Sequence, residues 1–340
     1  MSCKYCIMRV VILNHVEIVS MIRGLISYFT NYIFRGGNMT KKPIYVEIEM
    51  HTDIDTVWRY TQEPQLHEQW DLRFTSITYN EKTAEDAPQT FTYTTNVMPG
   101  ISVSGWGVSK GTHEKQSSMK TSSLHFGTEQ VISPIAEGKG YWQYIPHEQG
   151  VTFLTQYNYE VRFGLLGKGF DVLFKPAMGW ATALSSDVLK QWIENGEQPA
   201  TQYRRFFSYY IICIAMFVIW FYQGFMPKVW LTHPQEVDML MKLSGLAEHT
   251  AIQAVWWIGV AEMLFGLVWL IPFRKKKLFA LQIVLFPLLT VSALIANIET
   301  ATAPFNVITF NFALWVLSII GSMLADHLPT AASCKRKKVK

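Results

Sequence analysis

Four long apolar stretches in the second half of the chain constrain its fold more than any other feature of the sequence. They cover about 206–225, 251–271, 278–296 and 307–325. Each has close to the ~20 residues that a helix needs to cross the ~30 Å hydrocarbon core of a bilayer. Helices buried in a soluble bundle show a polar stripe, whereas these stretches are apolar on nearly every side. The pattern predicts an all-α bundle of four transmembrane helices over 206–326.

The distribution of Lys and Arg predicts how these helices are oriented. One side of the predicted spans carries eleven basic residues and the other carries two. The eleven are Arg204, Arg205, Arg274, Lys275, Lys276, Lys277, Lys335, Arg336, Lys337, Lys338 and Lys340; the two are Lys228 and Lys242. By the positive-inside rule, everything before Phe206 and a basic tail over 327–340 are predicted to be cytoplasmic. Basic runs beside membrane spans contact anionic lipid, so no nucleic-acid partner is expected.

The first 38 residues match neither a clean membrane span nor a signal peptide. Their apolar part, 7–34, is interrupted by charged and polar side chains, and no small-residue cleavage site follows it. One interpretation is a non-native or disordered extension ahead of a start at Met39, since the codons for Arg-Gly-Gly in RGGNM (35–39) can read as a ribosome-binding site. The other is an amphipathic helix on the membrane surface.

Residues 42–197 show the pattern of an α+β domain. A strand at 43–50 precedes a helix at 53–62, with Asp53 near its cap, and a short helix at 64–69. Strand-like runs then follow near 73–79, 90–97, 101–108, 119–126, 139–145 and 151–162. A long helix covers 171–195, ended by Gly196, and Pro176 is expected to break or bend its first turns.

The long helix must cover one face of the antiparallel sheet, because such a sheet shields only one side of its own core. It is expected to present Met178, Trp180, Ala181, Leu184, Val188, Leu189 and Trp192. A sheet wrapped around a helix leaves a cavity lined by apolar and aromatic groups. The candidate pocket residues are Trp58, His67, Trp70, Asp71, Arg73, Trp106, Trp142, Tyr144, Tyr157, Tyr159 and Trp180.

The element order and the stretch EIEMHTDIDTVWRYTQEPQLHEQWD (47–71) resemble the START-like helix-grip superfamily, which includes polyketide cyclases and allergen-type ligand carriers. The resemblance implies a hydrophobic ligand pocket and fixes no reaction. Two interpretations of HEQWDLRF (67–74) stay open. Asp71 or Arg73 holds a ligand head group, or Asp71 turns the chain while Trp70 and Phe74 enter the core.

Searches for known catalytic and metal-binding motifs are negative. No two of the nine histidines lie within ten residues of one another, which excludes the usual metal-binding pairs. Glycine-rich stretches have the wrong spacing for nucleotide loops, and GxSxG does not occur. The four cysteines give no disulfide framework. The sequence therefore predicts no catalytic residue and no metal site, and it favours a protein that is not an enzyme.

Glu262 is a lone carboxylate inside the apolar run GVAEMLFGLVW (259–269). Gly259, Glu262 and Gly266 share one helix face, and glycines mark close approach between helices. Glu262 is either a hydrogen-bonded structural acid or a carboxylate that binds a proton or ligand. Direct pairing with Lys228 would need the first helix to unwind or re-enter, which leaves Tyr222 and Gln223 as easier partners.

The stretches GFMPK (224–228), HPQE (233–236), GVAEMLFG (259–266) and APFN (303–306) resemble the four-helix branch of the DoxX-like membrane family. The resemblance marks a set of signature positions. Together with Gln223, Asn297 and Glu299 they are expected to form an outward-facing polar site. These signature positions are Gly224, Pro227, Lys228, Glu236, Glu262 and Gly266. Relatives associated with membrane redox systems imply quinone as a candidate cofactor and a redox protein as a candidate partner.

The covalent fusion of the two halves suggests a function. Seven residues separate Gly196 from Arg204, so the long helix stays within about 25 Å of the first span. The sequence predicts a membrane-tethered binding protein for a hydrophobic or amphiphilic ligand, such as a lipid, isoprenoid or quinone, at the inner membrane surface. Three alternatives stay open: an accessory subunit of a quinone-linked redox complex, an enzyme acting on a membrane-derived substrate through His67, Asp71 or Arg73, and a structural or stress-related scaffold.

Overall fold

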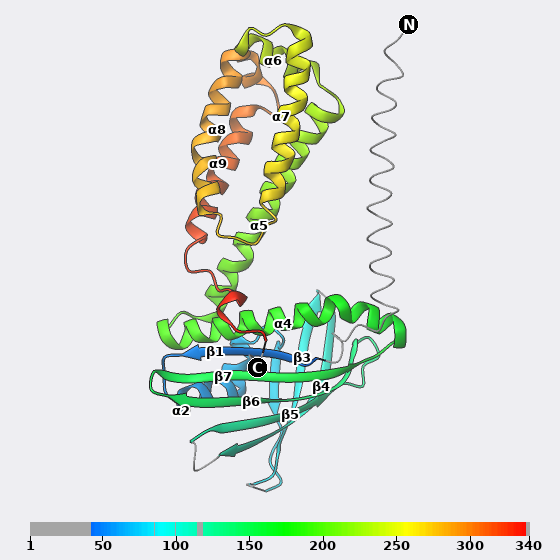
Figure 1. The fold of residues 1–340 in the computed structure, drawn as a ribbon, viewed down its shortest axis with the longest axis vertical. Coiled ribbons are helices and arrows are strands. Elements are labelled where there is room, and N and C mark those ends of the chain that lie inside the picture. The colour runs from blue at the N-terminus through cyan, green and yellow to red at the C-terminus, as the bar shows by residue number, and fades with distance from the viewer. Residues whose placement is uncertain (1–41, 85, 99, 114–117, 338–340) are drawn as a thin grey trace. The chain divides into compact units, whose positions relative to one another are not determined.

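The chain divides into two compact units. The computed structural model describes residues 42–84, 86–98, 100–113 and 118–337. The predictions for 1–38 and for the start at Met39 therefore lie outside the described residues. The first unit contains the chain up to Pro199 together with Thr330–Lys340, and the second contains Ala200–Pro329 (Figure 1).

The first unit is built on a seven-stranded antiparallel sheet with the order β1-β7-β6-β5-β4-β3-β2. Its strands are β1 Ile44–Met50, β2 Ser76–Tyr79, β3 Gln89–Met98, β4 Ile101–His113, β5 Lys120–Gly127, β6 Ile135–His147 and β7 Gly150–Val161. Helices α2 (Ile54–Gln62) and α3 (Pro64–Trp70) lie between β1 and β2 in the chain. Long helix α4 (Gly164–Asn195) runs across the sheet (Figure 1). This is the predicted helix-grip architecture.

Local chemistry explains why the elements begin and end where they do. Asp53 caps α2 as predicted, since its carboxylate accepts the backbone N–H of Thr56 at 2.7 Å. On β7, the side chains of Val151, Phe153 and Tyr157 are buried. The whole of β1 pairs with this strand. Gly196 ends α4 with a φ of 71°, a conformation that glycine adopts without strain.

Helix α4 differs from the prediction in two ways. It begins at Gly164, so Pro176 lies inside the helix and does not break its first turns. The proline removes one backbone hydrogen bond, and the helix continues through it to Asn195. The second half buries the residues expected there, among them Leu184, Leu189 and Trp192. The predicted inward position of Trp180 is wrong, because its side chain is 39% exposed.

The second unit consists mainly of long apolar helices. They are α5 (Pro199–Gln223), which continues as π-helix η1 (Gly224–Trp230), α7 (Glu248–Val268), α8 (Lys276–Ala296) and α9 (Val307–Leu324). By length and composition these form four candidate membrane spans, which confirms the predicted number and places. Short helix α6 (Pro234–Ser244) and the 3-10 turn η2 (Ile298–Thr302) were not predicted. The core between the spans contains Tyr209, Met216, Trp220, Trp269, Phe279 and Phe286.

The C-terminal segment belongs to the first unit and is not the separate basic tail that the sequence suggested. Lys335 forms an antiparallel bridge with Glu47 of β1, with two backbone hydrogen bonds of 2.9 Å. The Cys334 thiol donates to the carbonyl oxygen of Ala183 in α4, and the Thr330 N–H donates to Asp187 at 2.8 Å. A bilayer cannot separate paired residues, so the first unit and this segment lie on one side of it.

Candidate functional site

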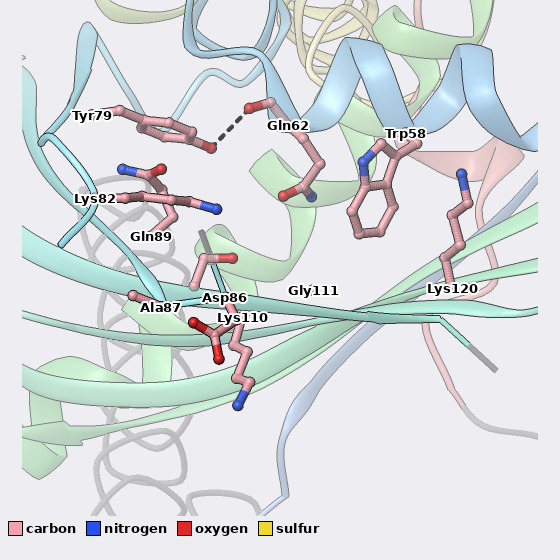
Figure 2. Close-up of a pocket in the computed structure, with 11 residues that line it drawn as sticks. Trp58, Gln62, Tyr79, Lys82, Asp86, Ala87, Gln89, Lys110, Gly111 and Lys120 are labelled. Carbon is pink, nitrogen blue, oxygen red and sulfur yellow. Dashed lines mark hydrogen bonds between the residues drawn. The ribbon is translucent and has the colours of Figure 1, made fainter. Parts of the chain in front are cut away.

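A pocket of about 500 Å³ opens in the first unit between α2 and strands β2 to β5 (Figure 2). Helix α2 supplies Trp58 and Gln62, and β2 supplies Tyr79. The segment joining β2 to β3 and the strands beyond it supply the remaining lining residues, which are Lys82, Asp86, Ala87, Gln89, Ser109, Lys110, Gly111 and Lys120. The pocket therefore combines an aromatic wall with several amino groups.

The Trp58 side chain forms the apolar wall because its neighbours fix its position. A Cβ atom at Gly111 would lie 3.0 Å from the indole, so glycine lets β4 approach the ring closely. The Lys120 ammonium lies 5.3 Å from the centre of the indole, within the range of a cation–π contact. Lys120 also pairs with Asp55. The Tyr144 ring lies 5.1 Å away on the buried side.

Hydrogen bonds hold the polar base of the pocket. The Tyr144 hydroxyl contacts the Thr61 hydroxyl at 2.7 Å and accepts from the Gln62 amide at 3.0 Å. The Tyr79 hydroxyl donates to the backbone carbonyl of Gln62 at 2.9 Å, the dashed contact in Figure 2. Burial raises the pKa of Tyr79 to about 12 and also raises the pKa of Tyr144. Both phenols stay neutral near pH 7 and serve as hydrogen-bonding groups rather than bases.

The lining carries positive charge from two lysines. Lys82 and Lys120 belong to it, with Asp86 as the acid of the lining. Lys110 lies opposite Ser123 in the sheet, and its side chain points away from Trp58 and Gln62 (Figure 2). Among the residues that the structure describes, no group of three or more His, Cys, Asp and Glu side chains could hold a metal ion. The pocket therefore offers stacking, hydrogen bonds and positive charge.

Only one predicted pocket residue, Trp58, lines this pocket. The others lie elsewhere in the first unit. Trp70, Trp142, Tyr144, Tyr157 and Tyr159 are buried in the core. Trp106 is half-buried, with its ring 5.0 Å from that of His125, and Trp180 is exposed. Sequence reasoning missed the lysines of the lining.

Asp71 is the centre of a buried charged cluster at the end of α3. The Arg73 guanidinium donates to both carboxylate oxygens, at 2.9 and 2.6 Å. The Arg73 backbone N–H and the His67 ring nitrogen complete the contacts, each at 3.1 Å. These partners occupy both oxygens, so the geometry fits the interpretation in which Asp71 turns the chain. Trp70, at 2% exposed, enters the core as that interpretation requires.

The pKa of Asp71 reports how strongly this cluster holds the charge. Burial alone raises the pKa of the carboxyl. The charge and hydrogen bonds of Arg73, with a smaller contribution from His67, outweigh burial and hold the pKa well below its usual range. Asp71 is therefore a permanent anion paired with Arg73, which suits a structural role better than proton transfer.

A second polar layer lies between β7 and the first half of α4. The Tyr159 hydroxyl donates to Asp171 at 2.6 Å, and the Lys175 ammonium donates to the side chain of Asn158 at 2.8 Å. The Tyr157 and Thr182 hydroxyls contact each other at 2.9 Å. The predicted pocket residues Tyr157 and Tyr159 thus fasten α4 to the sheet.

In the second unit, Lys228 pairs directly with two carboxylates. Its Nζ lies 3.1 Å from Oε2 of Glu262 and 3.5 Å from Oε2 of Glu236. The contact with Glu262 is an ion pair whose angles fall outside hydrogen-bond geometry. The expected obstacle to pairing is absent, because the first span continues as a π-helix to Trp230 and carries Lys228 alongside α7. Tyr222 is not the partner, since its side chain is 58% exposed.

Glycines bring the two helices close enough for this pairing. A Cβ atom at Gly224 would lie 2.4 Å from the carbonyl oxygen of Gly259, and one at Gly259 would lie 2.6 Å from Cβ of Lys228. Two turns further along α7, a Cβ at Gly266 would lie 3.0 Å from the backbone of Phe221. The predicted glycine face of α7 is thus its contact with the first span.

The remaining predicted members of the polar site are placed differently. Asn297 caps η2, where its side-chain oxygen accepts the N–H of Glu299 at 3.0 Å. Gln223 ends α5 without a side-chain cap. The structure therefore assembles Lys228, Glu236 and Glu262 from the predicted set and gives Asn297 and Glu299 a turn of their own.

The ion-pair cluster predicts an order of stabilities. Lys228→Met should destabilise the second unit by about 3–5 kcal/mol, because it leaves two carboxylates without their cation. Glu262→Gln should cost about 1 kcal/mol, since Lys228 keeps Glu236 as a partner. Unfolding of the purified proteins in a fixed lipid–detergent mixture gives both values. Equal losses for the two variants would contradict the assigned pairing.

The Asp71 cluster predicts a stability that depends on pH. The unfolded carboxyl has a pKa of about 3.9, and the folded one has a lower pKa. The stabilisation is therefore fully present above about pH 4 and is lost as the pH falls towards the folded pKa. Asp71→Asn should cost about 3–5 kcal/mol near pH 7 by leaving Arg73 without its partner. It should also flatten the acid side of a thermal unfolding profile. An unchanged slope below pH 4 would refute the assignment.

Two solved structures share similarity with the first unit at low overall scores. The STAR-related lipid transfer protein fragment from Xanthomonas axonopodis is 15% identical, with a TM-score of 0.31, and the match covers 39% of this chain and 78% of that one. The di-domain aromatase/cyclase StfQ of the steffimycin biosynthetic pathway is 13% identical, with a TM-score of 0.31, and covers 48% and 57% of the two chains. The helix-grip assignment follows from the sheet order and α4 themselves.

Sequence comparison connects most of the chain to a membrane protein. The DoxX-like family matches residues 217–319, from within α5 to within α9. The uncharacterized membrane protein YndG of Bacillus subtilis (strain 168) is 39% identical over 310 residues, which cover 89% of this chain and 100% of that protein. This chain therefore belongs to the family of YndG and is a membrane protein in which a helix-grip unit is joined to a DoxX-like unit.

Proposed function

We propose that the helix-grip unit binds an amphiphilic molecule from the bilayer and that the DoxX-like unit holds it at the inner membrane surface. The observation that carries the proposal is the pocket between α2 and strands β2 to β5, about 500 Å³ in volume. A pocket of this size is within the range of small-molecule sites. It also speaks against a scaffold with a filled core.

The lining indicates which amphiphile fits. Trp58 offers a flat apolar surface, and the amide of Gln62, which donates one N–H to Tyr144, has a second one for a ligand. The ammonium groups of Lys82 and Lys120 favour an anionic head group. Lipids, isoprenoids and quinones all join an apolar part to acceptor oxygens, and the lysines favour the anionic members, such as phospholipids and isoprenoid phosphates.

The short covalent link between the two units keeps the binding unit near the bilayer, the proposed source of its ligand. Helix α4 ends at Asn195 and α5 begins at Pro199, so at most about 14 Å of chain separates the two helices. A binding unit attached this closely samples the bilayer surface at high effective concentration. Enzymatic turnover has less support, because His67, Asp71 and Arg73 bind one another, and no observation favours a redox partner.

The pocket assignment predicts a loss of bound ligand on removal of charge. Full-length protein is purified through repeated detergent exchange, and the retained lipids are extracted and weighed by mass spectrometry. Wild-type protein should retain an anionic amphiphile near one molecule per chain. Lys82→Gln/Lys120→Gln should reduce retention about tenfold or more, since each charge-assisted hydrogen bond contributes about 1.5–3 kcal/mol.

Lys42→Gln/Lys139→Gln provides a matched control, because both side chains are exposed outside the pocket lining. This variant should retain the wild-type amount. Equal retention in all three proteins would assign the lipid to the surface of the membrane spans and refute the pocket. A bound neutral quinone, insensitive to the lysines, would refute the preference for an anion but not the pocket.

The cytoplasmic placement of the first unit rests on the distribution of Lys and Arg. It predicts that a cysteine introduced by Ser123→Cys, in a chain without its four native cysteines, resists an impermeant maleimide in intact cells. The same reagent should label Ala303→Cys, in the segment between α8 and α9. Permeabilised cells should label both. Labelling of Ser123→Cys alone in intact cells would invert the orientation.

A further inference from the structure

In the first part of α4, polar side chains face the sheet and apolar side chains face away from it, the reverse of the usual arrangement. Its inner face, against the sheet, carries Asp171, Lys175 and Thr182, whose exposed fractions are 2%, 8% and 2%. Its outer face carries large apolar side chains that stay exposed in the part of the unit that the structure describes. We call these the outer stripe: Leu165 at 79% exposed, Leu166 at 84%, Phe170 at 52%, Leu173 at 68% and Trp180 at 39%.

The stripe is a true helix face and extends beyond the helix. At 100° per residue, Leu166, Phe170, Leu173 and Trp180 fall within one narrow sector of α4. At the start of the helix, the Arg162 side chain donates to the carbonyl oxygens of Thr128 and Gln130. These contacts hold the segment before β6 beside the helix, where Val131 is 73% exposed and Ile132 is 60% exposed.

The charge on this part of the chain favours one partner. Between Gly164 and Trp180 the charged residues are Lys168, Asp171 and Lys175. Asp171 and Lys175 are buried against the sheet, whereas Lys168 is exposed. At 100° per residue Lys168 falls on the side of the helix opposite Leu166. The outer face therefore presents apolar side chains without a charged residue, as a helix face in contact with the apolar part of a bilayer does.

Chain connectivity makes the bilayer available to this face. The C-terminal end of α4 lies three residues before Pro199, where the candidate span Pro199–Trp230 begins. Helix α4 has 32 residues, a length of about 48 Å, so an arrangement along the membrane plane brings its first half to the same surface. A large exposed apolar surface of this kind is otherwise a liability in water.

We propose that the outer stripe of α4 lies in the interfacial layer of the bilayer and docks the helix-grip unit flat on the membrane. The polar inner face then follows from the same arrangement. Hydrogen bonds that involve Asp171, Lys175 and Thr182 fasten the helix to β7, while lipid covers the opposite face. This docking is separate from the pocket and does not depend on what the pocket binds.

The test places an environment-sensitive fluorophore on the stripe of the full-length protein. A chain without its native cysteines carries Leu166→Cys labelled with a nitrobenzoxadiazole dye and is reconstituted in phosphatidylglycerol–phosphatidylethanolamine vesicles. Its emission should shift to the blue, and lipids with a nitroxide on carbon 5 of the acyl chain should quench it several-fold. Leu166 is 84% exposed, so the substitution leaves the core intact.

Ser123→Cys is the matched control. Its neighbour Ser122 is buried and its hydroxyl donates to Gln62 of α2, so Ser123 points to the opposite face of the sheet. The dye there should stay in water, without shift or quenching. Equal quenching at both positions, or none at Leu166, would overturn the proposal. Disulfide-linked dimers of unlabelled Leu166→Cys without lipid quenching would identify the stripe as a contact between two copies and would also overturn it.

Discussion

The need to cover four apolar helices with hydrocarbon determines how the rest of this protein is arranged. The outer surfaces of the second unit expose large side chains, including Ile211 at 65%, Ile295 at 73% and Phe312 at 61%, and only a bilayer covers such an area. Because the spans are even in number, the chain returns to the side from which it started. Its last described segment can then pair with Glu47 on the edge of β1. The first unit is thus completed by residues that the ribosome makes after the membrane unit.

In both units, the charged side chains of the candidate sites lie beside partners. In the second unit, Lys228 lies between Glu236 and Glu262, and glycines without side chains let α7 approach closely enough for that contact. In the first unit, Asp71 is surrounded by its own cluster, and Asp171 meets Tyr159 beneath α4. Unpaired charges would cost several kcal/mol in either setting. Paired charges fix which helix faces meet.

The features predictable from sequence are those that a local pattern encodes. Uninterrupted apolar runs gave the four spans, and alternation with caps at Asp53 and Gly196 gave the strands and helices of the first unit. The misassigned features depend on partners distant in sequence. Trp180 fits the apolar periodicity of a core-facing helix. That periodicity shows that a helix face is apolar, but it does not show what contacts the face. Lys335 lies in a basic run that resembles a solvated tail in the sequence. Its partners Glu47 and Glu49 are distant in the chain and come beside it only on folding. Lys82 lies between β2 and β3 and Lys120 lies on β5, so only the folded sheet brings them to one pocket.

Two covalent connections, rather than one, join the units, and this lowers the entropic cost of membrane docking by α4. The chain passes between them once after Asn195 and once before Thr330, and the second passage is held by Asp187 of α4 and by β1. A unit attached at a single point tumbles about its linker, whereas attachment at two points removes much of that freedom in advance. The orientational entropy that interfacial binding normally costs is then largely lost already on folding. A short stripe of five side chains can therefore suffice to dock a helix that would bind only weakly as a free peptide.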